Sequence, residues 1–398
     1  PDEHAGAAGA QLMWRIITGL AKVHQIILIS FVNPEEDPTP LEQKGIRLHS
    51  VPYPRHYGSW TAVPVRVFLR RGLKLLISIF RFKPYELEKY RNRAMRRLAA
   101  RVIAEEKVDV VQCEYNLTAL NLPKGVTAPK VLVEHDVSMK PYARLMTSGH
   151  SSVSRLVGRF QSWFWRHTEP GLCNQFDSVI TLTAEDKNYL RERGVQVPIQ
   201  VIPPPVNVRT DIQVDKNTDV CFVGSFNRRP NQEALDEILS DIWPVVKRDH
   251  AACRLMIAGK HLTGKLLDRI QSDDRITYAG FVADIDTLIA SCSVFLAPIR
   301  LGGGLKMKIT HALACGTPVV ATAIGAEGIE IRPGEGLIVE DNPLEMARLA
   351  LGLLHSPGTV ERLSAAAAQA VQQKFSLSRA IERYQRIYHQ LVLKSGRG

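Results

Sequence analysis

The stretch from residue 294 to residue 328 constrains the fold of this 398-residue chain more than any other. Val294–Ala297 is a short apolar run of the kind that forms a buried parallel strand. Three glycines, residues 302–304, follow closely, and residues 305–315 then carry apolar side chains at helical spacing. A glycine and a proline separate this helix from a second short strand at residues 319–321. The order strand, glycine loop, helix, strand predicts an α/β fold.

The glycine loop also predicts an anion site. It places backbone N–H groups that have no intrahelical acceptor at the N-terminus of a helix, where hydrogen bonds and the helix dipole both favour an anion. Arg300 precedes the loop, and Lys306 and Lys308 lie in the first helical turn. The dipole disfavours a cation there unless a polyanion binds as well. The alternative is a glycine-rich turn flanked by solvated lysines, since glycine loops alone are weak evidence.

These residues resemble the donor-nucleotide loop of group 1 glycosyltransferases of family 4, in the bacterial branch whose loop reads Arg, then Gly-Gly-Leu-Lys. The matching residues are Arg300, Gly303, Gly304, Leu305 and Lys306, then ACGTPVVAT at residues 314–322 and GAEG at residues 325–328. The resemblance extends less sharply over nearly the whole chain. It implies the GT-B fold, in which two Rossmann-like α/β domains face a cleft, with the donor bound by the second domain and the acceptor by the first.

One position departs from the family pattern. The family usually carries two glutamates, eight positions apart, around this loop, and the second glutamate binds the donor ribose. The matching residues here are Gly303 and His311. Imidazole both donates and accepts, so His311 is expected to hydrogen-bond a ribose hydroxyl. The alternatives are weakened donor binding, or a histidine on a helix face with no ligand. Glu327, in the Gly-x-Glu-Gly element, joins the expected donor site.

The first strand of the second half is followed by Gly224, which the resemblance places in the donor site. The family often has an Arg and a Lys in this loop that hold the diphosphate. Ser225 and Pro230 occupy those positions here, so Arg228 or Arg229 is expected to substitute for them.

The resemblance places Phe281 and Val282 beside the nucleotide base, through backbone contacts. No metal ligand and no cofactor are expected beyond the nucleoside-diphosphate sugar itself. Asp284 and Asp286 open the next predicted helix, and nothing else in the sequence supports a metal site of Asp-x-Asp type.

In the first half, His135 follows directly after a predicted strand at residues 130–134. Open α/β sheets place their ligands at the carboxyl ends of strands. The resemblance implies that His135 contacts the transferred sugar. It also implies that Arg300 and Lys306 complete the catalytic set, because fixed positive charge would stabilise the leaving diphosphate in place of a metal. A histidine that only caps a loop is the alternative.

The length predicts two domains. The expected division is residues 1–205 for the acceptor-binding domain, residues 206–375 for the donor-binding domain, and residues 376–398 for a helix that crosses back to the first domain. The chain opens at residues 1–10 with a glycine-containing loop before a helix. An α/β domain normally has a strand before such a loop, so we expect the first strand to be absent and the sheet to have an exposed edge or a rearrangement.

The charge is uneven, with a net charge of +11 and thirteen basic against two acidic residues from Arg55 to Arg101. A helix predicted at residues 61–80 mixes basic and apolar side chains, which suggests peripheral contact with an anionic membrane; a core-packed helix is the alternative. No apolar run is long enough to span a membrane. The six cysteines form no C-x-x-C pair and are expected to be buried free thiols, as in a cytoplasmic protein.

The predicted activity is retaining, metal-independent transfer of a sugar from a nucleoside-diphosphate donor to a glycan or lipid-linked acceptor in cell-surface polysaccharide synthesis. Two alternatives stay open. A degenerate GT-B protein that binds nucleotide or glycan without turnover is favoured by His311 and by the absent strand. A sugar-nucleotide epimerase is possible on the same fold. Nothing in the sequence resembles a nucleic-acid-binding module, so no nucleic acid partner is expected.

Overall fold

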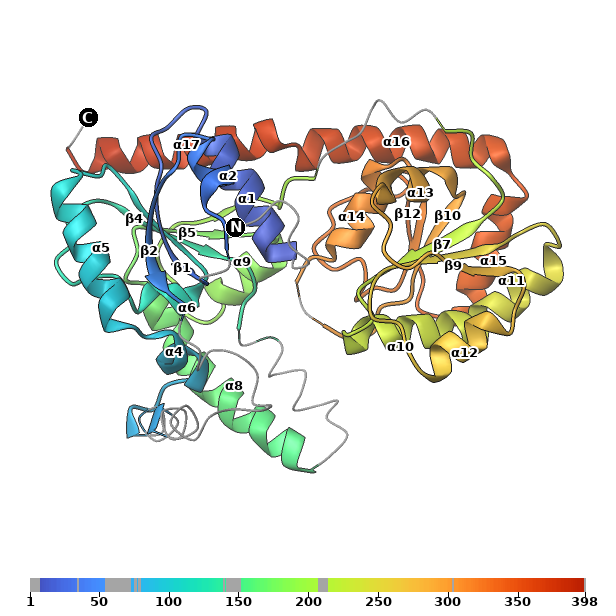
Figure 1. Ribbon diagram of the computed structural model, residues 1–398, viewed down its shortest axis with the longest axis horizontal. Helices are drawn as coiled ribbons and strands as arrows, with labels where there is room; N and C mark the ends of the chain where they lie inside the picture. Colours follow the sequence, from blue (N-terminus) through green and yellow to red (C-terminus); the bar gives the residue numbers. More distant parts are fainter. Residues whose placement is uncertain are drawn as a thin grey trace. The chain divides into compact units, whose positions relative to one another are not determined.

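The computed structural model describes residues 8–33, 36–53, 73–74, 77, 80–138, 140, 152–206, 214–302 and 304–396. The chain forms two compact units, one made of Pro1–Pro203 with Ala380–Gly398 and one made of Pro204–Arg379. Each unit combines helices with parallel strands, so the predicted α/β class is confirmed (Figure 1).

The second unit contains a six-stranded parallel sheet in the order β12-β11-β10-β7-β8-β9. Its strands are β7 (Val220–Val223), β8 (Leu255–Ala258), β9 (Ile276–Tyr278), β10 (Val294–Ala297), β11 (Val319–Ala321) and β12 (Leu337–Val339). This is the strand order of a doubly wound nucleotide-binding domain, and it reverses between β7 and β10. The loops after β7 and β10 therefore flank the switch point, which is where such sheets bind ligands.

The central strands β7, β8, β10 and β11 are apolar runs and almost entirely buried, as expected for a parallel sheet with helices on both faces. The helical segments are α10 (Arg229–Glu237), a π-helical turn (Ile238–Ile242), α11 (Trp243–Asp249), α12 (Lys265–Gln271), α13 (Ile285–Ser291), α14 (Met307–Ala314), α15 (Pro343–Leu354) and α16 (Pro357–Phe375). Phe222 packs between Phe226 and Phe295 in the core. The side chain of Asn342 caps α15 by accepting the N–H groups of Leu344 and Glu345.

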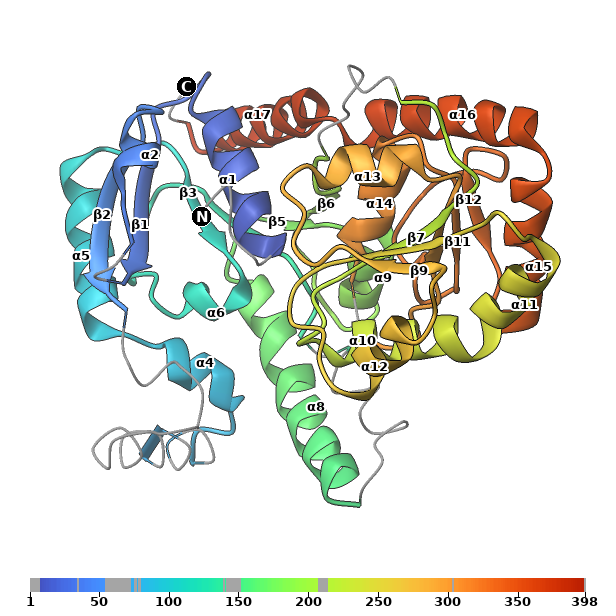
Figure 2. The same ribbon diagram turned by 45° about the vertical axis from the view of Figure 1, so that its right-hand side comes forward.

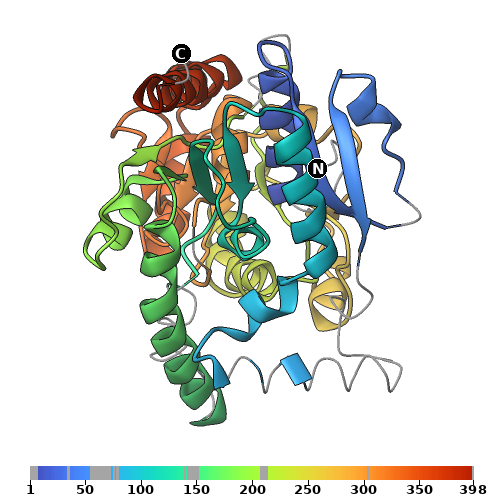
Figure 3. The same cartoon turned by 90° about the vertical axis from the view of Figure 1, so that its left-hand side faces the viewer.

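The described strands of the first unit form two separate parallel sheets (Figure 3). One holds β1 (Ile27–Val32) and β2 (Arg47–Pro52), and the other holds β3 (Val111–Glu114), β4 (Lys130–Glu134), β5 (Ser178–Thr181) and β6 (Ile199–Val201) in chain order. β1 is half-buried along its whole length, whereas β5 is fully buried. The sequence predicted a sheet with an exposed edge or a rearrangement, and a split sheet is what the described residues show.

The described helices of the first unit are α1 (Ala8–Leu20), α2 (Thr39–Glu42), α4 (Tyr85–Tyr90), α5 (Arg93–Glu105), α6 (Asn116–Ala119), α8 (Ser152–Cys173), α9 (Ala184–Arg191) and most of α17 (Leu377–Lys394). The charged stretch from residue 85 to residue 106 predicts one long helix, and this prediction is wrong because the structure has two helices there, α4 and α5. Asn92 is extended, and its side chain accepts the N–H groups of Ala94 and Met95, which starts a new helix. The basic helix predicted at residues 61–80 falls mostly outside the described residues.

Helix α8 carries a cluster of aromatic side chains that divides between core and surface. Trp165 is buried and packs in the core of the first unit, whereas Phe160 and Trp163 are exposed. Trp163 meets Phe82 edge to face, with ring centroids 6.4 Å apart. Within the described part of the chain, no helix is both long and apolar enough to cross a membrane.

Candidate functional site

Two glycines bring the ends of β7 and β8 close together at the switch point. Gly224 follows β7 and Gly259 follows β8. A Cβ added to Gly259, whose φ is +139°, would lie 1.7 Å from the carbonyl oxygen of Gly224. A Cβ on Gly224 would lie 2.9 Å from Nζ of Lys308. Sequence reasoning named Gly224 but missed Gly259, although a glycine directly after a buried strand was a visible signal.

Lys308 lies in the first turn of α14, the helix that follows the glycine loop. Its Nζ donates to Oδ1 of Asn231 in α10 at 2.6 Å and lies 4.7 Å from the centre of the Phe222 ring. Burial, helped by the nearby charge of Arg228, lowers the pKa of Lys308 to about 7. A negative charge beside this amine would favour its protonated form.

Lys306 occupies the cap position at the start of α14. Its Nζ donates to the carbonyl oxygen of Gly304 at 2.6 Å and lies 3.8 Å from Oε2 of Glu327. The Lys306 and Glu327 side chains are only 12% and 15% exposed. The structure thus brings together two predicted donor-site residues that are 21 positions apart in the sequence.

The glycine loop needs its glycines. Gly302 and Gly304 have φ values of +103° and +69°, in the region that favours glycine. Gly303 lies outside the described residues. Leu305 packs against the core of the second unit, which anchors the loop to α14.

Arg300 forms a bidentate ion pair at the base of this loop. Its Nε and Nη2 donate to the two carboxylate oxygens of Glu237 in α10, each at 2.6 Å, and Nη2 also donates to the Asp341 carbonyl oxygen. This pairing, led by the hydrogen bonds to Glu237, raises the pKa of Arg300. The guanidinium is therefore held by α10, while Lys306 and Lys308 lie on α14.

Arg228 and Arg229 start α10, the helix that follows the Gly224 loop. Arg228 is exposed, and its charge acts on Lys308. Arg229 is exposed and donates through Nε to Oε1 of Glu233, one turn further along, at 2.7 Å.

Phe281 and Val282 follow β9 at the same edge of the sheet. Phe281 is 69% exposed, and the Nζ of Lys260 lies 4.2 Å above its ring. The Gly259 N–H donates to the Gly280 carbonyl oxygen at 2.7 Å and ties this loop to the end of β8. The predicted base-flanking residues therefore lie near the glycines of the switch point.

His311 meets an acidic partner that the sequence did not predict. Its Nε2 lies 2.6 Å from Oδ1 of Asp286 on α13. One ligand atom each of Asp286, His311 and Cys315 lie within 4.8 Å of one another. Asp284 does not join them and caps α13 by accepting from Thr287. The six cysteines form no disulfide, as predicted, and five of them are buried, whereas Cys315 is half-buried.

In the first unit, His135 is paired with Glu114. The parallel strands β3 and β4 are neighbours, so their carboxyl ends meet. The Nε2 of His135 lies 2.6 Å from Oε2 of Glu114, and its ring stacks on Tyr115 with centroids 3.9 Å apart. Tyr388 of α17 extends the network by donating to Gln112, which in turn donates to Glu114. The sequence gave no sign of this pairing.

Two buried carboxyl groups lie behind this pair, and sequence reasoning missed both. Glu169 accepts from Nδ2 of Asn116 and from the N–H of Ser138, each at 2.8 Å. Glu134 lies in the same buried cluster, near Cys173. Burial and, second, the neighbouring Glu169 hold the pKa of Glu134 well above its usual range. Glu134 directly precedes His135 at the end of β4.

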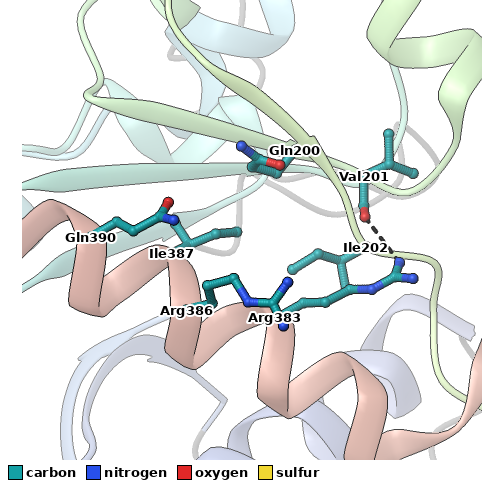
Figure 4. A pocket seen from close by; sticks show the side chains of 7 residues that line it. All are labelled: Gln200, Val201, Ile202, Arg383, Arg386, Ile387 and Gln390. Carbon is teal, nitrogen blue, oxygen red and sulfur yellow. Dashed lines mark hydrogen bonds between the residues drawn. The ribbon is translucent and has the colours of Figure 1, made fainter.

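A cavity of about 370 Å³ lies between β6 and α17 of the first unit (Figure 4). Its lining residues are Gln200, Val201, Ile202, Arg383, Arg386, Ile387 and Gln390. Arg383 donates to the carbonyl oxygen of Val201 at 3.2 Å. None of the predicted site residues lines this cavity.

Two family models match the chain. Residues 9–205 match the glycosyl transferase 4-like domain, and residues 217–356 match the glycosyl transferases group 1 domain. The chain is 22% identical over 281 residues to an uncharacterized 44.6 kDa protein in the cps region of Klebsiella pneumoniae, covering 68% of this chain and 71% of that protein. It is 26% identical over 170 residues to a GDP-mannose-dependent phosphatidylinositol monomannoside mannosyltransferase of Corynebacterium glutamicum, covering 40% of this chain and 45% of that enzyme.

Solved structures share the fold at low sequence identity. Sucrose-phosphate synthase from Thermosynechococcus elongatus aligns with a TM-score of 0.67 at 15% identity, over 98% of this chain and 94% of that one. Anabaena HepE in complex with UDP aligns with a TM-score of 0.65 at 15% identity, over 97% of both chains. The chain therefore belongs to the glycosyltransferases: it is a transferase of the GT-B fold, with a 4-like domain in its first half and a group 1 domain in its second.

Proposed function

We propose that this glycosyltransferase moves a sugar from a nucleoside-diphosphate donor to a glycan or lipid-linked acceptor in cell-surface polysaccharide synthesis. The observation that carries the donor assignment is the pair of lysines at the start of α14, at the switch point of the second unit's sheet. Lys306 lies beside the glycine loop, and Lys308 lies beside Gly224 with a pKa of about 7. Together with the loop N–H groups they suit a diphosphate.

The relatives support this class of donor and process. HepE was solved with UDP and with UDP-glucose, and the Corynebacterium enzyme is GDP-mannose-dependent. The Klebsiella relative is a protein of the cps region. We propose that the donor is a nucleoside-diphosphate sugar, and we leave open whether its nucleotide is UDP or GDP. We also propose that this chain belongs to the branch of the family whose loop reads Arg…Gly-Gly-Leu-Lys.

The proposed reaction retains the anomeric configuration and uses no bound metal. Lys306, Lys308 and the loop N–H groups stabilise the charge that develops on the leaving diphosphate. Arg300 adds its charge once the diphosphate competes with Glu237 for the guanidinium. His135, oriented by Glu114, contacts the transferred sugar.

His311 is proposed to bind the donor ribose. Asp286 is an acceptor, so the neutral imidazole carries its proton on Nε2, which faces Oδ1 of Asp286. This tautomer leaves Nδ1 as an acceptor for a ribose hydroxyl. The histidine thus supplies one of the acceptor positions that a glutamate supplies in other members of the family.

The acceptor side is proposed to work at an anionic membrane surface. Phe82, Phe160 and Trp163 are exposed, and Arg81 and Arg159 lie next to two of them in the sequence. Aromatic and basic side chains together suit the headgroup region of a bilayer. Co-sedimentation with vesicles of phosphatidylglycerol, but not of phosphatidylcholine alone, tests this contact, and the Trp163→Ser variant is expected to reduce it.

Product analysis tests the reaction itself. The purified protein is incubated with UDP-, GDP- and ADP-sugars and a membrane extract as acceptor source, and the products are identified by mass spectrometry and NMR. We expect a glycosylated product of retained configuration that forms equally well in excess EDTA. An isomerised donor without acceptor would indicate an epimerase instead.

A second candidate function is nucleotide or glycan binding without turnover. It is favoured by His311 at the ribose position and by the pairing of Arg300 with Glu237. Donor binding with neither transfer nor isomerisation would establish it.

A further inference from the structure

Asp286, His311 and Cys315 gather on one side of the second unit, where α13 and α14 lie side by side (Figure 2). His311 and Cys315 are four residues apart at the end of α14, so both side chains lie on the same face of that helix. Asp286 comes from the first turn of α13. A carboxylate, an imidazole and a thiol thus converge from two neighbouring helices.

The three groups are close enough to share one ion. Their ligand atoms lie within 4.8 Å of one another, and Nε2 of His311 is 2.6 Å from Oδ1 of Asp286. Ligand atoms around a tetrahedral zinc ion are separated by about 3.3 to 3.7 Å, given its usual bond lengths. Small side-chain rotations therefore suffice, with the Asp286–His311 pair opening and Cys315 moving closer.

We propose that Asp286, His311 and Cys315 bind a zinc ion that links α13 to α14. Thiolate and imidazole ligands select zinc over magnesium or calcium. One thiolate and one carboxylate also cancel the charge of a divalent ion. The three side chains leave a fourth position for water, as in zinc sites with three protein ligands.

Binding changes the protonation of two of the ligands. The Cys315 thiol loses its proton to solvent as the sulfur–zinc bond forms. The ion takes the place of the proton between His311 and Asp286, and the ring proton moves through solvent from Nε2 to Nδ1. The ion is redox-inert and does not touch the glycine loop. With zinc bound, Nδ1 of His311 carries the ring proton and donates to a ribose hydroxyl instead of accepting from it, so His311 can serve the ion and the proposed ribose contact together.

Zinc titration of the chelator-treated protein tests the site. With the zinc ion as the only ligand and a chromophoric chelator as competitor, we expect one ion per chain and a raised melting temperature. The variants Cys315→Ser and His311→Gln are each expected to weaken binding by about 10-fold or more, because even outer-shell partners of a metal contribute that much. Magnesium is expected to leave the melting temperature unchanged.

Cobalt substitution gives a readout that a folding defect does not imitate. Cobalt bound to the wild-type protein is expected to show a thiolate-to-metal charge-transfer band that Cys315→Ser lacks. His389→Gln, an exposed histidine on α17, is the matched control and keeps full affinity. Absence of stoichiometric zinc binding, or binding that Cys315→Ser leaves unchanged, would overturn the proposal, whatever the donor assays show.

Discussion

The amine of Lys308 lies 2.6 Å from the amide oxygen of Asn231, and this contact joins α14 to α10 at the switch point of the second unit's sheet. Lys308 is the residue on which the pH dependence of donor binding is expected to rest. Its pKa of about 7 is far below the usual lysine value because burial, and then Arg228, disfavour the charge.

Nucleotide affinity is expected to fall as the pH rises above about 7. A bound diphosphate raises the pKa of Lys308, so above pH 7 the complex takes up a proton that the free protein lacks. The loss is at most about 10-fold per pH unit until the pKa of the complex is reached. Calorimetric titration with UDP or GDP at several pH values measures it. Lys308→Met is expected to bind more weakly at pH 7 and to lose this dependence; an unchanged slope in that variant would exclude Lys308.

Arg300 and Glu237 allow a direct test of the role of the guanidinium. Replacing Arg300 by Ala removes a charge proposed to stabilise the leaving diphosphate and is expected to lower kcat by about 100-fold or more. Glu237→Gln breaks the ion pair but keeps Arg300, so it is expected to retain most of the activity. Steady-state kinetics measure kcat for both variants. An equal loss of kcat in the two would mean that the Arg300–Glu237 ion pair only holds the loop in place.

Protonation of Glu134 is expected to make the stability of the first unit depend on pH. The folded state holds a proton that an unfolded carboxyl group releases above its ordinary pKa of 4.5. Stability therefore decreases as the pH rises from about 4.5 toward the raised pKa of the folded state. Glu134→Gln keeps the shape without the proton and is expected to melt at a higher temperature than wild type at pH 8.

The matched comparison is a melting curve at each pH from 4.5 to 8 for both proteins. The difference between the melting temperatures of Glu134→Gln and wild type should grow with pH. A constant difference across this range would mean that Glu134 is ionised in the folded state and that Glu169 holds the proton instead.

Gly259→Ala is expected to cost more than about 4 kcal/mol of unfolding free energy, or to prevent folding, because no side chain has room 1.7 Å from the Gly224 carbonyl. Gly264→Ala is the control. Gly264 also has a positive φ, of +66°, but no atom lies within 4 Å of the place that a Cβ would occupy there, so only about 1 to 2 kcal/mol of backbone strain is expected. Urea unfolding compares the two, and similar losses would argue against the close approach.

The sequence predicted best the elements whose pattern is local. Strands β4, β10 and β11 have the limits that the sequence predicted, because short buried apolar runs bounded by turns define them. The break at Asn92 was missed because an asparagine cap looks like an ordinary polar residue within a charged helix. The π-helical turn at Ile238–Ile242 separates α10 from α11, and Pro244, which has no backbone N–H to donate to the preceding turn, follows it two residues later.

The individual site residues were predictable, but their partners were not. His135, Lys306 and His311 stood out by type and position, whereas Glu114, Glu237 and Asp286 became visible only when distant strands and helices met. Such pairs depend on tertiary contacts between segments from 21 to 63 residues apart. A single sequence carries no local sign of them.

The most direct test of the account is thermal melting of the wild-type protein and the Lys306→Ala variant with UDP, GDP, ADP and their sugar conjugates. A ligand that binds only the folded state raises the melting temperature by mass action. We predict a clear rise for wild type with one nucleotide and its sugar, and little or none for Lys306→Ala. No rise with any nucleotide, or an equal rise in both proteins, would contradict a donor site at the glycine loop.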